Sequence, residues 1–179
     1  REFFKGEARK MDVAKSLECD AEKQVISFCV WGRGQQRGSK QARVRYDSNG
    51  KPVTKNGRVL TFATDDNHKS KSWMQEVKRA AIAELGRIDL LQGPIELTAR
   101  FYFARPKSHY GSGKNAGVLK ASAPVYHAQS PDLDKLTRAL GDSLTGVVIH
   151  DDKLIVRIIS ERIWTTQAER TEVEVRELG

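Results

Sequence analysis

The sequence contains no long apolar run. None of its stretches approaches the roughly 18 to 20 consecutive apolar residues that a membrane span needs. The first residues, REFFKGEARKMDVAK, carry charges where a secretory signal would have an apolar centre. Cysteine is also scarce: Cys19 and Cys29 match no zinc-binding spacing, and nothing in the sequence supports a bridge between them. These absences predict a soluble intracellular protein.

Acidic residues are in the minority. Lys and Arg number 31 and Asp and Glu 23, which gives a net charge of +8. Excess positive charge favours a polyanionic partner such as nucleic acid, although it can also serve only solubility. The excess is greatest over residues 32–62, where eight cations face the single acid Asp47. Those cations are Arg33, Arg37, Lys40, Arg43, Arg45, Lys51, Lys55 and Arg58.

Hydrophobic spacing predicts a helix over 70–85 and a half-buried strand over 95–103. In the first segment apolar residues recur at steps of four, and Gly86 can end the helix. In the second they alternate with polar residues, as on a strand with one face on the core. The helical set is Trp73, Val77, Ala81 and Leu85, and the strand set is Ile95, Leu97, Ala99, Phe101 and Phe103.

The remaining segments complete a single α+β domain. Apolar runs at 24–31 and 153–164 predict strands, and the alternation over 171–178 predicts a last strand that closes a terminal hairpin. The turn pairs Asn49-Gly50 and Asn56-Gly57 predict one or two hairpins, and 105–129 reads as a long basic loop. We therefore expect one mixed sheet with two main helices packed on it.

The expected domain spans 24–179, and 1–23 is a charge-rich arm. Met11 is a candidate native start, in which case residues 1–10 are a cloning scar or upstream read-through.

Residues 130–152, SPDLDKLTRALGDSLTGVVIHDD, gather five aspartates in this basic chain. Ser130 can cap a helix whose first residue is Pro131, because proline there loses no needed donor. The pair Asp151-Asp152 then stands at the mouth of the next strand. The apolar stripe of the helix is Leu133, Leu136, Leu140 and Leu144, and a polar face carries Asp134, Arg138 and Asp142.

Two interpretations of these acids are open. Acids at a helix start complement its dipole by about 0.3–1 kcal/mol each, and an acid pair can be a polar turn. Alternatively, Asp132, Asp134 and Asp152 hold one or two Mg²⁺ ions, if the helix start and the strand start converge. Three carboxylates about 5 Å apart would repel by roughly 3 kcal/mol per pair at an effective dielectric of 20, so they would require a cation or the protonation of some of them. The basic surroundings favour the metal site of a nuclease.

The motif PDLDKLTRALGDSLTGVVIHDD resembles the signature of the RusA Holliday junction resolvases, in which D-x-D-N, a following lysine and a later D-D pair mark the active site. FYFARPKSHYGSGKN (101–115) is similar to the strand and basic loop before that signature. WGRGQQRGSKQAR (31–43) corresponds to the basic segment after the first strand. The resemblance covers roughly residues 24–178 and implies a RusA-like fold.

The resemblance also implies roles for individual residues. Asp132 and Asp134 match the first two metal-binding aspartates, and Asp152 matches the third, with its acidic neighbour Asp151 a further candidate metal ligand. Arg138 stands where the family usually has a catalytically important lysine, and Lys135 replaces the usual Asn after D-x-D. Both substitutions depart from the family pattern, since a planar guanidinium is not equivalent to an ammonium. The implied DNA-binding cations are Arg33, Arg37, Lys40, Arg43, Lys107, Lys114 and Lys135.

The activity implied is that of a crossover junction endodeoxyribonuclease. Such an enzyme makes paired, symmetric, Mg²⁺-dependent incisions in four-way DNA junctions during recombination and repair, with Mn²⁺ able to substitute. Two symmetric cuts require two active sites, which a twofold homodimer supplies. The expected location is the cytoplasm of a bacterium or a phage-infected host, with neither a membrane nor a nucleotide cofactor as partner.

Other readings remain open. Lys135 and Arg138 are compatible with a non-catalytic, structure-selective DNA-binding protein whose metal site has degenerated. A D-x-D motif also occurs in metal-dependent glycosyltransferases, but this short chain has no nucleotide-binding pattern. GSGKN (111–115) is not a Walker A motif, because Ser108 and Asn115 stand where Gly and Ser or Thr are required. A structural protein with incidental acids is the remaining alternative.

Overall fold

The computed structural model describes residues 25–38, 40–65, 67–86 and 89–179, so the expected N-terminal arm and Cys19 lie outside the described residues. Cys29 is a free thiol. The strands are β1 (Val25–Trp31), β2 (Lys40–Val44), β3 (Thr54–Lys55), β4 (Arg58–Val59), β5 (Thr61–Asp65), β6 (Ile95–Ala104), β7 (Ile155–Thr165) and β8 (Arg170–Glu177). The α-helices are α1 (His68–Leu85) and α2 (Leu133–Leu144).

A four-stranded mixed sheet forms the body, in the order β1-β8-β6-β7. The last strand, β8, is antiparallel to both of its neighbours, whereas β7 is parallel to β6. The expected terminal hairpin is therefore wrong: β7 and β8 follow each other in sequence but lie on opposite sides of β6. The connection from β6 through α2 to β7 is a crossover, which a parallel pair requires.

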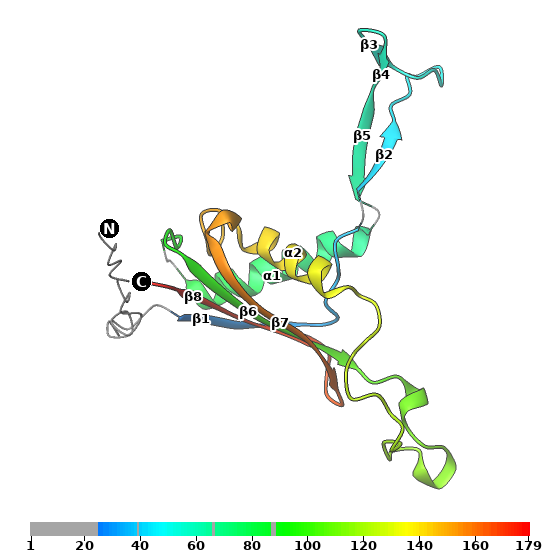
Figure 1. The fold of residues 1–179 in the computed structure, drawn as a ribbon, viewed down its shortest axis with the longest axis vertical. Coiled ribbons are helices and arrows are strands. Elements are labelled where there is room, and N and C mark those ends of the chain that lie inside the picture. The colour runs from blue at the N-terminus through cyan, green and yellow to red at the C-terminus, as the bar shows by residue number, and fades with distance from the viewer. Residues whose placement is uncertain (1–24, 39, 66, 87–88) are drawn as a thin grey trace, which may run out of the picture.

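Both helices pack on the same face of this sheet (Figure 1). The predicted core face of β6 is confirmed, since all five of its apolar side chains are fully buried. The predicted helical stripes are confirmed as well: Val77, Leu136 and Leu140 are fully buried, and each stripe continues along its helix. Neither α1 nor α2 is long and apolar enough to cross a bilayer, within the part of the chain that the structure describes.

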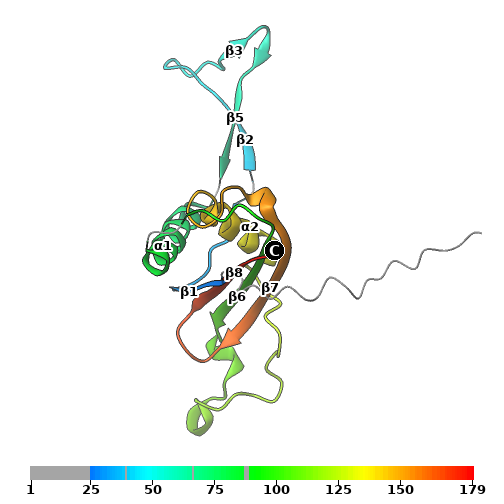
Figure 2. The ribbon, with the colours of Figure 1, turned by 90° about the vertical axis from the view of Figure 1, so that its left-hand side faces the viewer.

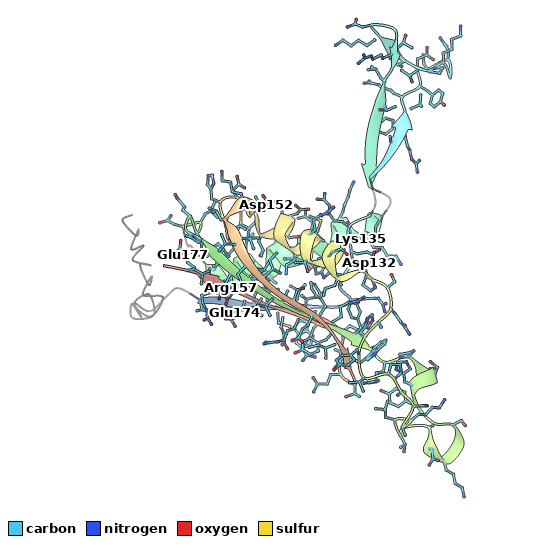
Figure 3. The ribbon with its side chains drawn as sticks, in the orientation of Figure 1. Asp132, Lys135, Asp152, Arg157, Glu174 and Glu177 are labelled. Carbon is cyan, nitrogen blue, oxygen red and sulfur yellow. The ribbon has the colours of Figure 1, made fainter. Side chains whose placement is uncertain are left out.

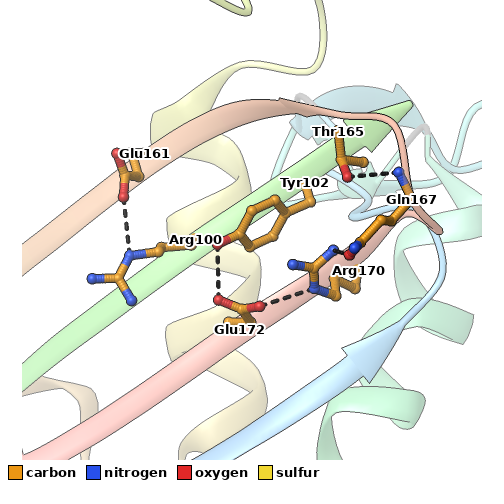
Figure 4. Close-up of polar contacts among 7 residues, drawn as sticks. All are labelled: Arg100, Tyr102, Glu161, Thr165, Gln167, Arg170 and Glu172. Atoms are coloured by element: carbon orange, nitrogen blue, oxygen red, sulfur yellow. Dashed lines mark hydrogen bonds and ion pairs between the residues drawn. The ribbon is translucent and has the colours of Figure 1, made fainter. Parts of the chain in front are cut away.

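The opposite face of the sheet is lined by paired charges (Figure 4). Glu172 accepts hydrogen bonds from Tyr102 Oη and from Arg170 Nε, both at 2.9 Å. Arg170 also lies over the Tyr102 ring at 3.9 Å from its centroid. Next to this group, Arg100 Nε donates to Glu161 at 3.1 Å. Because Arg100 and Arg170 are paired with carboxylates, they add little net positive charge to this face of the sheet.

Residues 40–65 form a two-stranded ribbon that stands away from the body (Figures 1 and 2). Strands β2 and β5 pair along its stem, from Lys40 opposite Asp65 to Val44 opposite Thr61. Its outer part, residues 45–60, carries the β3–β4 hairpin, closed by Asn56 and Gly57 at positive φ. That pair suits a two-residue hairpin turn, as the sequence predicted. We refer to 40–65 as the ribbon and to 45–60 as its head.

The long loop 105–129 leaves the body on the other side (Figure 1) and is anchored by aromatic packing. The His127 ring lies between Phe103 and Trp164, with centroids at 4.4 and 4.2 Å. The indole N–H of Trp164 donates to the Tyr126 carbonyl at 3.0 Å. His127 is only 4% exposed, and its Nδ1 has no hydrogen-bond partner among the described residues. Burial lowers the pKa of His127, and the nearby cations Arg162 and Arg33 act in the same direction.

This histidine predicts acid destabilisation of the protein. Because the pKa of His127 is lower in the folded state than its ordinary value near 6.5, the unfolded state binds the proton first as pH falls. The His127 contribution to stability is therefore present above about pH 6.5 and is lost as pH falls from there through the folded pKa. We expect the Tm to be lower at pH 5 than at pH 7.5.

The variant His127→Phe keeps a ring between Phe103 and Trp164 but cannot titrate. Melting curves of the two proteins at both pH values check the prediction. An equal acid shift in the variant would assign the effect to other groups.

Candidate active site

The start of α2 presents two acidic side chains to solvent. Asp132 occupies the N-cap position and Asp134 lies in the first turn, so the expected cap at Ser130 with Pro131 as first helical residue is wrong. The Asp132 side chain makes no capping hydrogen bond. Its Oδ2 instead pairs with Lys135 Nζ at 2.7 Å, and this contact raises the pKa of Lys135. Figure 3 shows Asp132 and Lys135 at the end of α2 below the stem of the ribbon.

Two side chains hold this end of α2 in place. Gln36 Oε1 accepts a hydrogen bond from the backbone N–H of Asp132. From β7, Arg162 donates to the carbonyl oxygens of Gln129 and Pro131, the residues that lead into the helix. The start of α2 is therefore fixed between segment 32–38 and the sheet.

Segment 32–38 reaches α2 by passing directly over the core. A Cβ on Gly34 would lie 3.2 Å from Phe101 Cδ1 and 3.4 Å from Leu136 Cδ2, so this close approach favours glycine. Further along, the Arg37 backbone N–H donates to the Lys135 carbonyl at 3.3 Å. The segment thus brings Gln36 to the helix start.

The polar face of α2 contains one engaged acid and two exposed residues. Asp142 forms an ion pair with Arg37. Asp134 and Arg138, one helical turn apart, are both exposed and form no ion pair with any residue that the structure describes. Arg138 therefore pairs with neither Asp134 nor Asp142 among the described residues. The pair Asp134 and Arg138 remains available to a ligand.

The other two aspartates lie beyond the far end of α2. Asp151 caps a short 3-10 turn (η4, Asp152–Leu154): its Oδ1 accepts from the Lys153 N–H at 3.0 Å, which lowers the pKa of Asp151. Asp152 is exposed beside it. Figure 3 shows Asp152 and Asp132 at opposite ends of α2, a helix of 12 residues, which corresponds to about 18 Å.

The helix start and the strand start therefore do not converge within one chain. No group of three or more His, Cys, Asp or Glu side chains suited to a metal ion occurs in the described part of the chain. One subunit presents two carboxylates at one end of α2 and two at the other.

The predicted DNA-binding cations fall into three groups. Arg33 and Arg37, near the start of α2, are paired with Glu169 and Asp142 respectively. Lys107 and Lys114 are exposed on loop 105–129, on the side of the body away from the ribbon. Lys40 and Arg43 lie in β2, on the stem of the ribbon.

Sequence reasoning missed Gln36 and Arg162, the residues that position the site. No local pattern distinguishes Gln36 from the polar residues around it. Arg162 did carry a signal, because it shares a strand face with Ile158 and Trp164 in the apolar run 153–164. A cation at such a position predicts a buried polar partner.

A search of curated proteins finds no match to this chain. The family model described as Endodeoxyribonuclease RusA matches residues 38–176. The match runs from the stem of the ribbon to the end of β8, so it includes both helices and all four aspartates at the two ends of α2. The chain therefore belongs to the RusA endodeoxyribonuclease family and is a hydrolase that acts on DNA, of the kind that resolves Holliday junctions.

Proposed function

We propose that this protein resolves four-way DNA junctions by paired, symmetric, Mg²⁺-dependent hydrolysis, as a homodimer whose two active sites each take residues from both subunits. The proposal rests on the separation of the aspartates: Asp132 and Asp134 lie at the start of α2, whereas Asp151 and Asp152 lie beyond its other end. In a symmetric dimer, the start of α2 in each subunit could lie beside Asp152 of the other subunit, which would bring the carboxylates together at two sites.

The residues at the start of α2 fit a magnesium ion in part. Mg²⁺ prefers oxygen ligands and usually takes one or two carboxylates together with waters and phosphate oxygens. Asp132 and Asp134 offer such carboxylates on an exposed helix start whose own N–H groups Asp132 does not cap. They would bind Mg²⁺ more firmly with a third carboxylate, which Asp152 of the partner subunit would supply.

The outer edge of β7 supports a dimer. This strand ends the sheet, and Val156, Ile158 and Ile159 are 64%, 52% and 50% exposed along it. A long apolar edge strand invites pairing with another chain, and soluble proteins usually protect such edges. A second copy of β7 would cover the edge and extend the sheet.

Charge pattern favours one register for that pairing. If two β7 strands pair antiparallel about Ile159, Arg157 lies opposite the partner's Glu161, and the same pair recurs across the twofold axis. Opposite charges across neighbouring strands stabilise a sheet. Arg157 and Glu161 already contact Glu96 and Arg100 within the chain, and both remain substantially exposed.

This register would also assemble the active site. Arg162 lies beneath the start of α2, where it holds the Pro131 carbonyl. In the dimer it would face the partner's Val156, and the chain before that residue leads to the partner's Asp152. The twofold axis of an antiparallel pair is perpendicular to the sheet, so the helices of both subunits would lie on the same face. Each start of α2 would then adjoin the partner's acidic turn.

Bound Mg²⁺ would polarise the scissile phosphate and lower the pKa of an attacking water. Arg138 would bind a phosphate oxygen and stabilise the charge that develops in the transition state. Lys135 neutralises Asp132 in the free protein, and its ammonium could move to a DNA phosphate once a metal takes that carboxylate. Asp151 would keep its structural role in the turn and so orient Asp152.

A cleavage assay tests the function. With Mg²⁺, and with Mn²⁺ in its place, the purified protein should cut a synthetic four-way junction at two symmetric positions and leave linear duplex intact. The excess of the junction rate over the duplex rate is the measurement. Equal cutting of both substrates would point to a nuclease without junction preference.

A non-catalytic DNA-binding protein is the second candidate. The ion pair between Lys135 and Asp132 favours it, because an ammonium already occupies a position beside the first carboxylate. This alternative expects junction binding with no cleavage under any divalent ion. The same assay, run with a binding measurement, separates the two.

A further inference from the structure

The head of the ribbon concentrates unpaired positive charge. Its four cations, Arg45, Lys51, Lys55 and Arg58, are all exposed, and none forms an ion pair with any residue in the described ranges. Asp47 is the one acid among residues 45–60. Its carboxylate accepts hydrogen bonds from the N–H groups of Asn49 and Lys51, both at 2.9 Å, and so closes a turn. The head therefore presents a field of cations to an outside partner.

The shape of the ribbon suits a nucleic-acid groove. The B-DNA major groove, about 12 Å wide, admits a two-stranded β-ribbon. The head packs on itself through backbone hydrogen bonds, such as Arg45 N–H to the Leu60 carbonyl at 2.9 Å. Tyr46 in the head and Phe62 at the adjoining end of the stem are exposed at 60% and 49%. Rings at the rim of a basic ribbon can lie against deoxyribose.

The ribbon is tied to the candidate active site by hydrogen bonds at its base. Asn67, which follows β5 and caps α1, donates from Nδ2 to the Gln36 carbonyl at 2.7 Å. The Gln36 side chain in turn accepts from the Asp132 N–H. A duplex bound at Asp132 would therefore lie beside the stem of the ribbon.

We propose that the ribbon head is a second DNA-binding site, which holds the phosphates of a duplex arm away from the cut. The inference rests on the proposed junction cleavage and extends it to the arms. At about 3.3 Å per residue, the stretch from Lys40 to Asp47, where a turn sends the chain back, reaches at most about 23 Å, or about seven base pairs of B-DNA. DNA binding at the head would thus depend on the length of the arm, whereas binding at the start of α2 would depend on the branch point.

The test compares the parent with a variant that carries Arg45→Gln, Lys51→Gln, Lys55→Gln and Arg58→Gln. Binding to a junction with arms of about 20 base pairs is measured over a range of salt concentrations. Each lost phosphate contact reduces the slope of log K against log salt by about 0.9, so the variant should lose about 3 to 4 units of slope. A matched control replaces four cations of α1 and the outer sheet face, Lys78, Arg79, Arg100 and Arg176, by Gln and should keep the slope within about one unit of the parent.

Shortened arms provide the second measurement. Arms of about six base pairs reach no farther along the ribbon than Arg45, so on these junctions the slopes of the parent and the head variant should differ by about one unit or less. A head variant with the slope of the parent on long arms would overturn this inference while leaving junction cleavage intact. A parent protein that neither binds nor cuts junctions would remove the proposed function, and this inference with it.

Discussion

Asp132→Asn is expected to reduce junction cleavage by about 10²- to 10³-fold while leaving junction binding within about twofold of the parent. The amide keeps the size of the side chain but removes the charge that would hold Mg²⁺. Binding is retained because the cations that contact phosphates are unchanged. Asp134→Asn is expected to behave in the same way. Single-turnover cleavage and a binding titration in Ca²⁺ measure the two effects separately.

Asp142→Asn is the matched control, because it makes the same change on the same helix. Its carboxylate is held by Arg37 and is not one of the proposed metal ligands. This variant should cleave at a rate close to that of the parent. A fully active Asp132→Asn would remove the metal role of the α2 start.

Two inactive variants are expected to restore activity when they are combined. In the proposed dimer one active site uses Asp132 of one subunit and the partner's Asp152. A heterodimer of Asp132→Asn and Asp152→Asn subunits therefore has one site with both changes and one site with neither. Co-expression in equal amounts makes half of the dimers heterodimers, so about a quarter of all sites are intact. We expect single nicks in place of paired cuts, since only one site of each heterodimer works.

Co-expression of Asp132→Asn with Asp134→Asn is the control for this experiment. Both changes lie at the same end of α2, so every site retains at least one defect and no activity should return. Sites built within single subunits would give no rescue in either mixture. Nicked and linear products separate on a gel, which reads out both outcomes.

The local elements of this fold could be predicted because they depend on periodicity. The apolar residues of β6 alternate, and those of α1 and α2 recur at steps of three and four, as burial on one face demands. Val77, Phe101 and Leu140 each lie in the core as expected. The candidate acids could be identified for a different reason: aspartates clustered in a basic chain indicate a local role, such as binding a metal ion.

The arrangement of these elements could not be predicted from the same signals. The alternation in β8 indicates a strand but not its neighbours, and the pairing with β1 joins residues far apart in the chain, such as Ile26 and Val175, which are 149 positions apart. Asp132 and Asp152 both lie at element ends, yet the rigid length of α2 keeps them apart. The exposed apolar edge at Ile159 is visible only when β7 is known to end the sheet.

The two ends of the ribbon lie side by side, with Lys40 paired to Asp65. An insertion whose ends meet can grow or shrink by whole strand pairs without displacing the elements that flank it. Segment 32–38 and α1 would keep their places over the core at any ribbon length. Evolution can therefore adjust the reach of this nuclease without rebuilding its catalytic body.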